Sequence, residues 1–92
     1  MIVPRVKKKP KLRLDYQLIE RWIPEGARVL DLGCGDGQLL EDLMGAKNIV
    51  GRGIDVSDGE VLKCISRGVP VYHGDMMEGM SFYKDGYFDT VI

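Results

Sequence analysis

The chain has 92 residues and a nearly balanced charge, with 13 lysines and arginines against 14 aspartates and glutamates. A chain of this length forms one small domain at most and buries only about 60–65% of its unfolded surface. Two cysteines without a C-x-x-C pair and a single histidine favour neither a zinc site nor a disulfide framework. Since no apolar run approaches the roughly 18 residues of a membrane span or forms a signal-peptide core, we expect a soluble cytoplasmic protein.

The charges are unevenly distributed along the chain. Residues 1–13 carry six basic side chains and no acid, so all 14 acidic residues lie in the remainder. A basic arm on an acidic body can contact nucleic acid, but here no aromatic residues interleave with the lysines to stack on bases. We therefore expect residues 1–13 to form a flexible, solvated arm, with RNA binding as the alternative.

Glycine and proline residues divide the rest of the chain into alternating helical and extended segments. In chain order, the predicted elements are helix 15–23, strand 28–32, helix 38–45, strand 48–55, helix 57–67, strand 69–73 and strand 88–92. Asp15 is the predicted cap of the first helix, and Ser57 with Glu60 is predicted to form a reciprocal capping box at the third. The predicted buried face of that third helix consists of Val61, Leu62 and Ile65.

This alternation predicts an α/β fold with a parallel sheet between two layers of helices, a three-layer Rossmann-like architecture. Right-handed crossovers give the strand order 3-2-1-4. The sequence stops on the apolar strand 88–92, which leaves one sheet face and the last strand uncovered. We therefore expect residues 14–92 to be the N-terminal, cofactor-binding part of a longer domain. The alternative is a complete small domain that dimerises, and for this chain alone we expect poor stability or self-association through the exposed sheet face.

The most informative segment is Val-Leu-Asp-Leu-Gly-Cys-Gly-Asp-Gly at residues 29–37, where an apolar strand enters a loop with glycine at every second position. A dinucleotide site would need a small residue where Gln38 stands, and a P-loop would need a nearby lysine. The pattern therefore favours a ligand with a carboxylate, an amine and a ribose but no phosphate, such as S-adenosylmethionine. Gly33, Gly35 and Gly37 would let the backbone approach this ligand or adopt positive φ. The amides of the following helix start would bind its carboxylate.

An acidic residue lies at or close to the end of each of the first three predicted strands. Asp31 can accept a hydrogen bond from the ligand's ammonium group or brace the loop itself. Asp55, eighteen residues after Gly37, stands where nucleotide sites place an acid for the two ribose hydroxyls. Asp75 can accept from the adenine amino group while Met76 covers the ring, although a Gly-Asp pair is also an ordinary turn.

Two further residues have the chemistry of a catalytic group without its surroundings. Cys34 lies between loop glycines near a helix N-terminus, which can lower a thiol pKa, but the sequence shows no partner base. We interpret it as a small residue that fills the loop. His73 stands at a predicted strand end, where a lone histidine is usually structural, and we predict no role for it in the site.

These motifs resemble those of the class I S-adenosylmethionine-dependent methyltransferases. The segments that carry the resemblance are 29–37, Asp55, Gly74-Asp75 and 85–92, within a match that extends from Asp15 onward. Within that superfamily the chain is similar to the MetW proteins of methionine biosynthesis. The segments that carry this finer resemblance are Leu12 to Asp15, Ile19, Trp22 to Pro24, 31–37 and Arg67 to Val69.

The resemblance implies a Rossmann-like methyltransferase fold with S-adenosylmethionine as its cofactor. The predicted cofactor-binding residues are Asp31, Gly33, Cys34, Gly35, Gly37, Asp55, Val56, Asp75 and Met76. In this superfamily the groups that position the methyl acceptor follow the fourth strand, so we predict no catalytic residue and expect this chain alone to be inactive. Three functions remain open: a MetW-type methyltransferase, a non-catalytic partner that assists homoserine O-acyltransferase, and a fragment of an RNA methyltransferase.

Overall fold

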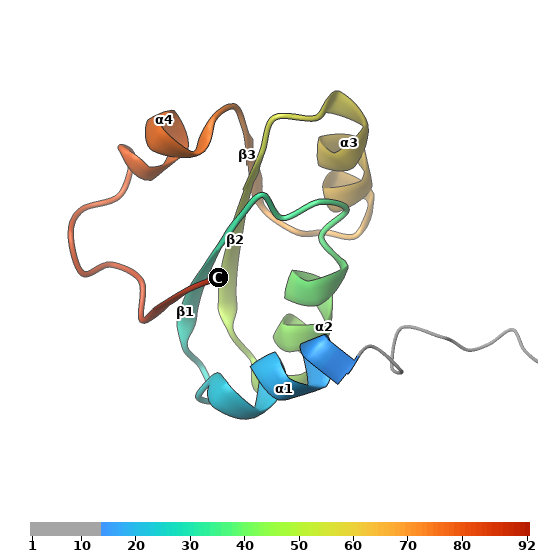
Figure 1. Cartoon of the computed structure of the whole chain (residues 1–92), viewed down its shortest axis with the longest axis vertical. Helices are drawn as coiled ribbons and strands as arrows, with labels where there is room; N and C mark the ends of the chain where they lie inside the picture. The colour runs from blue at the N-terminus through green and yellow to red at the C-terminus, as the bar shows by residue number, and fades with distance from the viewer. Residues whose placement is uncertain (1–13) are drawn as a thin grey trace, which may run out of the picture.

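The computed structural model describes residues 14–92 (Figure 1). The predicted basic arm lies outside the described residues. In chain order, the elements are α1 (Leu14–Trp22), β1 (Arg28–Leu32), α2 (Gln38–Lys47), β2 (Val50–Asp55), α3 (Asp58–Ser66), β3 (Val71–His73), α4 (Met76–Met80) and β4 (Thr90–Val91). In this part of the chain, no helix is long and apolar enough to cross a membrane.

The four strands form one parallel sheet in the order β3-β2-β1-β4, which confirms the predicted topology. Helices α1, α2 and α3 lie on one side of the sheet, and α4 with the loop after it lies on the other (Figure 1). The winding of the chain reverses at β1, because β2 and β3 follow on one side of it and β4 pairs with its other side. Ligands of open α/β sheets bind at the carboxyl ends of the strands at such a reversal.

The core lies between the sheet and helices α1 to α3. Its most deeply buried large side chains are Leu40, Leu43 and Val29, together with the Cys64 thiol. Ile54 is also buried, but against α4 on the other side of the sheet. Two glycines in β2 allow this close packing. A Cβ at Gly51 would lie 3.2 Å from Leu40, and one at Gly53 would lie 2.5 Å from the Cys34 sulfur. Larger residues at these positions would push α2 and the loop before it away from the sheet.

The predicted buried face of α3 is wrong for two of its three residues. Leu62 and Ile65 are 66% and 61% exposed, whereas Val61 and Cys64 are buried. The reason is that α3 contacts the protein only along a narrow stripe, where Cys64 packs against the glycine loop. Periodicity detected an apolar helix but did not identify which side meets its neighbours.

Several predicted helix ends also differ from the structure. Asp15 lies inside the first turn of α1 rather than at its cap. Helix α2 continues past Gly45 to Lys47, and the following residue, Asn48, adopts the left-handed conformation at its C-cap. The capping box is only half formed, because Ser57 accepts from the Glu60 amide while its own amide donates to Asp55 instead of Glu60.

The segment between β3 and β4 contains a short helix that the sequence analysis did not predict. Helix α4 has five residues, and Asp75 caps it by accepting a hydrogen bond from the Glu78 amide at 2.9 Å. A Cβ at Gly79 would lie 2.7 Å from Ile54, so this glycine lets α4 pack directly on β2. Tertiary contacts therefore stabilise a helix that is too short to form alone.

Candidate ligand-binding site at the carboxyl edge of the sheet

A glycine-rich loop, residues 33–37, joins β1 to α2 at the carboxyl edge of the sheet and holds its shape through its own hydrogen bonds. The amides of Gly33 and Cys34 donate to the Ile54 carbonyl at 2.8 and 3.0 Å, and the Gly35 amide donates to Asp55 Oδ2 at 2.9 Å. Gly33, Gly35 and Gly37 have φ values of +70°, +60° and +84°, as predicted for these positions. The loop is thus formed in advance of any ligand.

The three loop glycines differ in what lies beside them. Nothing lies within 4 Å of the position that a Cβ would take at Gly33, so its backbone faces open space. At Gly37 that position is 2.9 Å from the Cys64 sulfur. The expectation that all three glycines clear space for a ligand therefore fits Gly33, whereas Gly37 is required for packing against α3.

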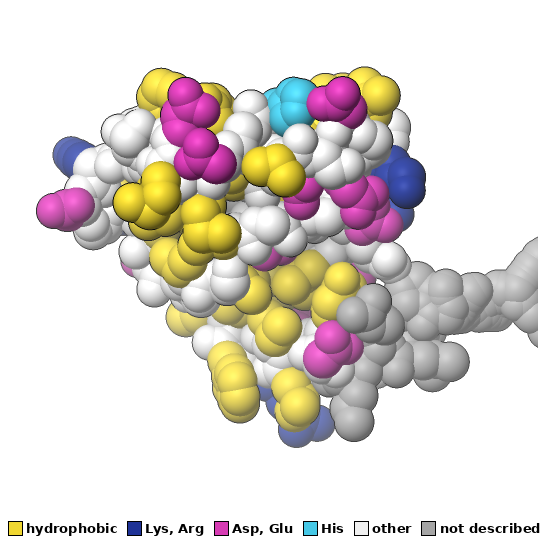
Figure 2. Space-filling model, turned by 45° about the horizontal axis from the view of Figure 1, so that its top comes forward, with side chains coloured by type: hydrophobic (Ala, Val, Ile, Leu, Met, Phe, Trp, Pro, Cys, Tyr) yellow, Lys and Arg dark blue, Asp and Glu magenta, His cyan; other side chains and the backbone are white. Residues whose placement is uncertain are grey.

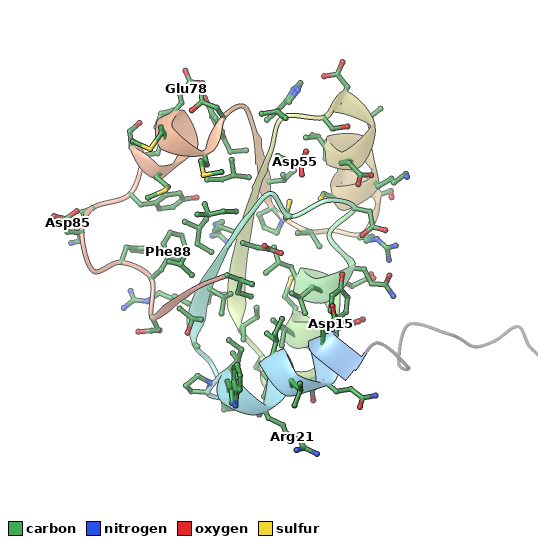
Figure 3. All side chains as sticks on the ribbon, viewed as in Figure 1. Asp15, Arg21, Asp55, Glu78, Asp85 and Phe88 are labelled. Atoms are coloured by element: carbon green, nitrogen blue, oxygen red, sulfur yellow. The ribbon has the colours of Figure 1, made fainter. Side chains whose placement is uncertain are left out.

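Asp55, the last residue of β2, connects the loop to the next helix. Its Oδ2 accepts from the Gly35 amide and its Oδ1 accepts from the Ser57 amide, both at 2.9 Å. In Figure 3 its side chain lies beside the glycine-rich loop, between the end of β2 and α3. Each carboxylate oxygen has a second lone pair, so Asp55 can brace the protein and still accept from the hydroxyls of a ligand.

Asp31 is a buried carboxyl group in β1, with 7% of its surface exposed. It forms no hydrogen bond with any residue in the described range, although its oxygens keep some contact with solvent. Burial first, and the negative charge of Asp55 second, raises the pKa of Asp31 from 3.8 to about 6. A buried carboxyl group without a partner is destabilising when ionised, and a bound cation would stabilise it.

A small cavity of about 120 Å³ opens beside these groups. Its lining residues are Gly33, Ile54, Asp55, Val56, Gly74 and Met76. Four of the predicted cofactor-binding residues, from the ends of three different segments, therefore meet at one place. The walls are largely apolar, which suits the flat face of an aromatic ring.

We call the place where the glycine-rich loop, Asp55 and this cavity meet the corner of the sheet. The other predicted site residues lie close to this corner without lining the cavity. Asp75 uses one oxygen to cap α4, so its second oxygen remains for another donor. The Cys34 side chain points into the core, where its sulfur lies 3.7 Å from that of Cys64. Burial raises the pKa of the Cys34 thiol to about 12, so the helix N-terminus does not activate it.

The start of α2 is less open to an anion than the sequence suggested. Asp36 Oδ1 already accepts from the Gln38 amide at 3.0 Å. Arg67 holds the same carboxylate, with its guanidinium 3.4 Å from Asp36 Oδ2. The protein thus supplies its own anion at this helix N-terminus.

Sequence reasoning missed a third acidic side chain at the loop. Glu60 was assigned only a capping role, but its Oε2 lies 3.4 Å from the position of a Cβ at Gly35. The sequence did contain an indication of the position of Glu60, because one face of the helix that follows Asp55 must pack against the loop. Across residues 14–92, no group of three or more His, Cys, Asp or Glu side chains is arranged to hold a metal ion.

Comparisons with known proteins agree on one family. The model of the family described as methionine biosynthesis protein MetW matches residues 13–92. A bifunctional methionine biosynthesis protein MetXA/MetW from Rhodopirellula baltica is 34% identical over 97 residues, which cover 97% of this chain and 16% of the relative. The chain therefore spans about one sixth of the length of this curated relative.

Solved structures share the fold. A SAM-dependent methyltransferase from Thiobacillus denitrificans, in complex with S-adenosyl-L-homocysteine, has a TM-score of 0.69 and 26% identity over 99% of this chain and 43% of its own. A SAM-dependent methyltransferase from Geobacter sulfurreducens, with the same ligand, has a TM-score of 0.61 and 28% identity over 96% and 38%. One from Archaeoglobus fulgidus has a TM-score of 0.64 and 30% identity over 88% and 39%.

Proposed function

Because the chain belongs to the MetW family and has the class I methyltransferase fold, we propose that it binds S-adenosylmethionine at the carboxyl edge of its sheet. In this proposal residues 14–92 are the cofactor-binding part of a methyltransferase-like protein linked to methionine biosynthesis. The methyl group of the ligand is already activated by the sulfonium, so this part of the chain serves to bind and orient it.

The polar groups left open at the corner support this proposal. The amides of Gly33, Cys34 and Gly35 already donate within the protein. What remains at the surface of the loop is acceptor capacity, chiefly from the carboxyl groups of Asp31 and Asp55. Such a corner favours donors and cations over phosphates, and S-adenosylmethionine carries an ammonium, a sulfonium and a ribose diol.

In this proposal each functional group of S-adenosylmethionine has a partner of suitable chemistry at the corner. The ammonium group would pair with Asp31, and the ribose hydroxyls would donate to the free lone pairs of Asp55. The adenine ring would enter the apolar cavity between Val56 and Met76, and its amino group would donate to Asp75. The open space at Gly33 would leave room for the chain between the ribose and the amino-acid end.

Calorimetry with S-adenosylmethionine and S-adenosylhomocysteine tests this proposal, and Gly33→Ala sharpens it. The new methyl group would enter the space assigned to the ligand. Gly86→Ala is the matched control, because Gly86 also has positive φ, +77° against +70°, and also has nothing within 4 Å of its Cβ position. Both variants should be destabilised by about 1 kcal/mol, but only Gly33→Ala should lose ligand affinity.

Two results would remove the proposal. One is the absence of binding heat at millimolar ligand in a sample whose circular dichroism shows folded protein. The other is an equal effect of both substitutions on affinity, since the open space at Gly33 would then not be used by the ligand.

A second proposed activity is association with a homoserine acyltransferase. The relative from Rhodopirellula baltica has MetXA and MetW in the name of one polypeptide, which supports a physical link between the two activities. A pull-down of the acyltransferase with this chain, followed by an acyltransferase assay of the mixture, tests it. If the two proteins neither associate nor alter the acyltransferase rate, this activity is excluded.

The apolar edge of the sheet between α1 and β4 supports the proposal that the chain also associates with itself. Trp22 and Val91 are 77% and 55% exposed, and both line a hollow of about 220 Å³ beside β4. Hydrophobic side chains gather across the face shown in Figure 2. Light scattering should therefore give a mass above 10.3 kDa that rises with concentration. A stable monomer at all concentrations would contradict this proposal.

A further inference from the structure

His73 makes two contacts that join separate segments near the candidate site. It is the last residue of β3, and its side chain is half exposed. Its Nε2 lies 2.8 Å from Asp58 Oδ1 and 3.2 Å from the carbonyl oxygen of Val56. The histidine, cyan in Figure 2, lies beside an acidic side chain at the surface. Because both neighbours are acceptors, Nε2 carries a proton and donates to them.

The first contact is with Asp58, the first residue of α3, and the second is with Val56 in the connection between β2 and α3. Val56 also lines the cavity described above. The same connection is held from its other end by Asp55, which accepts from the Ser57 amide and whose carbonyl accepts from the Gly74 amide at 3.0 Å. The ring of His73 is thus the side-chain link from β3 that restrains Val56.

An exposed histidine–aspartate pair alone would be of little consequence, because such pairs contribute little to stability. Two observations distinguish this one. The same nitrogen also contacts a backbone carbonyl, and that carbonyl belongs to a residue of the cavity wall whose side chain is 67% exposed. A wall residue with so little packing around it depends on backbone restraints to keep its place.

We infer that His73 is a positioning residue for the nucleoside end of the ligand, acting through Val56. This inference rests on the proposed function and assigns within it a role to a residue outside the predicted site. With His73 in place, the β2–α3 connection is ordered before binding. Without it, part of the binding free energy would be used to order this connection.

The test compares substitutions at His73 that differ in the reach and the presence of a hydrogen-bond donor. Glutamine carries its amide about as far from the backbone as Nε2, asparagine is too short, and leucine has no donor. We expect His73→Gln to bind S-adenosylhomocysteine like the parent chain. His73→Leu and His73→Asn should bind it about threefold to tenfold more weakly, as for the loss of one or two hydrogen bonds.

A second ligand separates positioning of the nucleoside from a general effect on the protein. 5′-Methylthioadenosine has the nucleoside and the sulfur but no amino-acid end. His73→Leu should weaken binding of both ligands by the same factor, because they share the part that Val56 contacts. Arg28→Gln is the control: it removes another exposed ion pair, with Asp89 at 4.0 Å, at the opposite end of the sheet. It should leave both affinities unchanged.

The outcomes distinguish this inference from the proposed function. If the parent chain binds neither ligand, the proposed function fails and the role of His73 with it. If the parent binds but His73→Leu binds equally well, or loses affinity only for S-adenosylhomocysteine, the positioning role is refuted while the proposed function stands. If His73→Leu does not fold, the contrast between glutamine and asparagine decides: equal affinities of these two variants would refute the role.

Discussion

Asp31→Asn tests whether the buried carboxyl group of β1 serves a ligand or braces the loop. Burial and Asp55 raise the pKa of Asp31 from 3.8 to about 6, so the protein disfavours the ionised form. A raised pKa in the folded state means that the contribution of the group to stability is full below pH 3.8 and is lost as the pH rises through 6. Asparagine resembles the protonated acid and avoids this loss.

The size of the effect follows from the two pKa values. The stability gained by Asp31→Asn over the parent should grow by about 2 kcal/mol between pH 4.5 and pH 7.5, at 1.36 kcal/mol per pKa unit spanned. Urea unfolding of both proteins at these pH values measures it. Asp85→Asn is the control for the loss of a carboxyl group, because Asp85 is exposed on the loop far from the corner in Figure 3.

The same substitution should have the opposite effect on ligand affinity. The parent should bind S-adenosylhomocysteine more weakly below pH 6, because the ammonium of the ligand needs the ionised carboxylate. Asp31→Asn should bind about tenfold more weakly at pH 7.5 and lose this pH dependence. If Asp31→Asn is instead less stable than the parent at pH 7.5, the carboxylate braces the loop and the assignment to the ammonium is refuted.

Three further predictions concern the loop and α3. Gly37→Ala should be destabilised by about 2 kcal/mol or more in urea unfolding, because φ is +84° and the new methyl group would lie 2.9 Å from the Cys64 sulfur; a neutral effect would contradict the packing of α3 on the loop. Leu62→Lys should change the thermal midpoint little, since the side chain is 66% exposed, whereas a large loss would restore the face predicted from the sequence. The Cys34 thiol should not react with a disulfide reagent at pH 8 until the protein unfolds, and rapid labelling of native protein would show that burial does not raise its pKa.

The elements that position the site were predictable because strong local signals specify them. The bounds of β1 agree with the prediction, since apolar residues end abruptly at a glycine with positive φ. The strand order followed from the alternation of helices and strands and from the handedness of crossovers. The glycine-rich loop, Asp55 and Met76 then had to lie near one another, because the carboxyl ends of parallel strands share one edge of the sheet.

What could not be predicted depends on contacts between distant segments. The apolar residues of α3 fit two helical faces, and only the position of the glycine-rich loop selects the one with Cys64. Helix α4 needs Gly79 against Ile54, a contact between residues far apart in the chain. The raised pKa of Asp31 likewise depends first on burial by the folded chain and second on the charge of Asp55, which comes from a neighbouring strand.

The corner has more hydrogen-bond acceptors than donors left for a ligand. Its backbone donors are used to hold the loop, while Asp31 is left without a hydrogen bond among the described residues and next to the charge of Asp55. This arrangement lowers the stability of the empty protein at neutral pH, and a bound cation would recover that stability. A loop that only reversed the direction of the chain would not be stabilised by an ionisable group in this position. The unfavourable placement of Asp31 is therefore better explained by a positively charged ligand than by the fold.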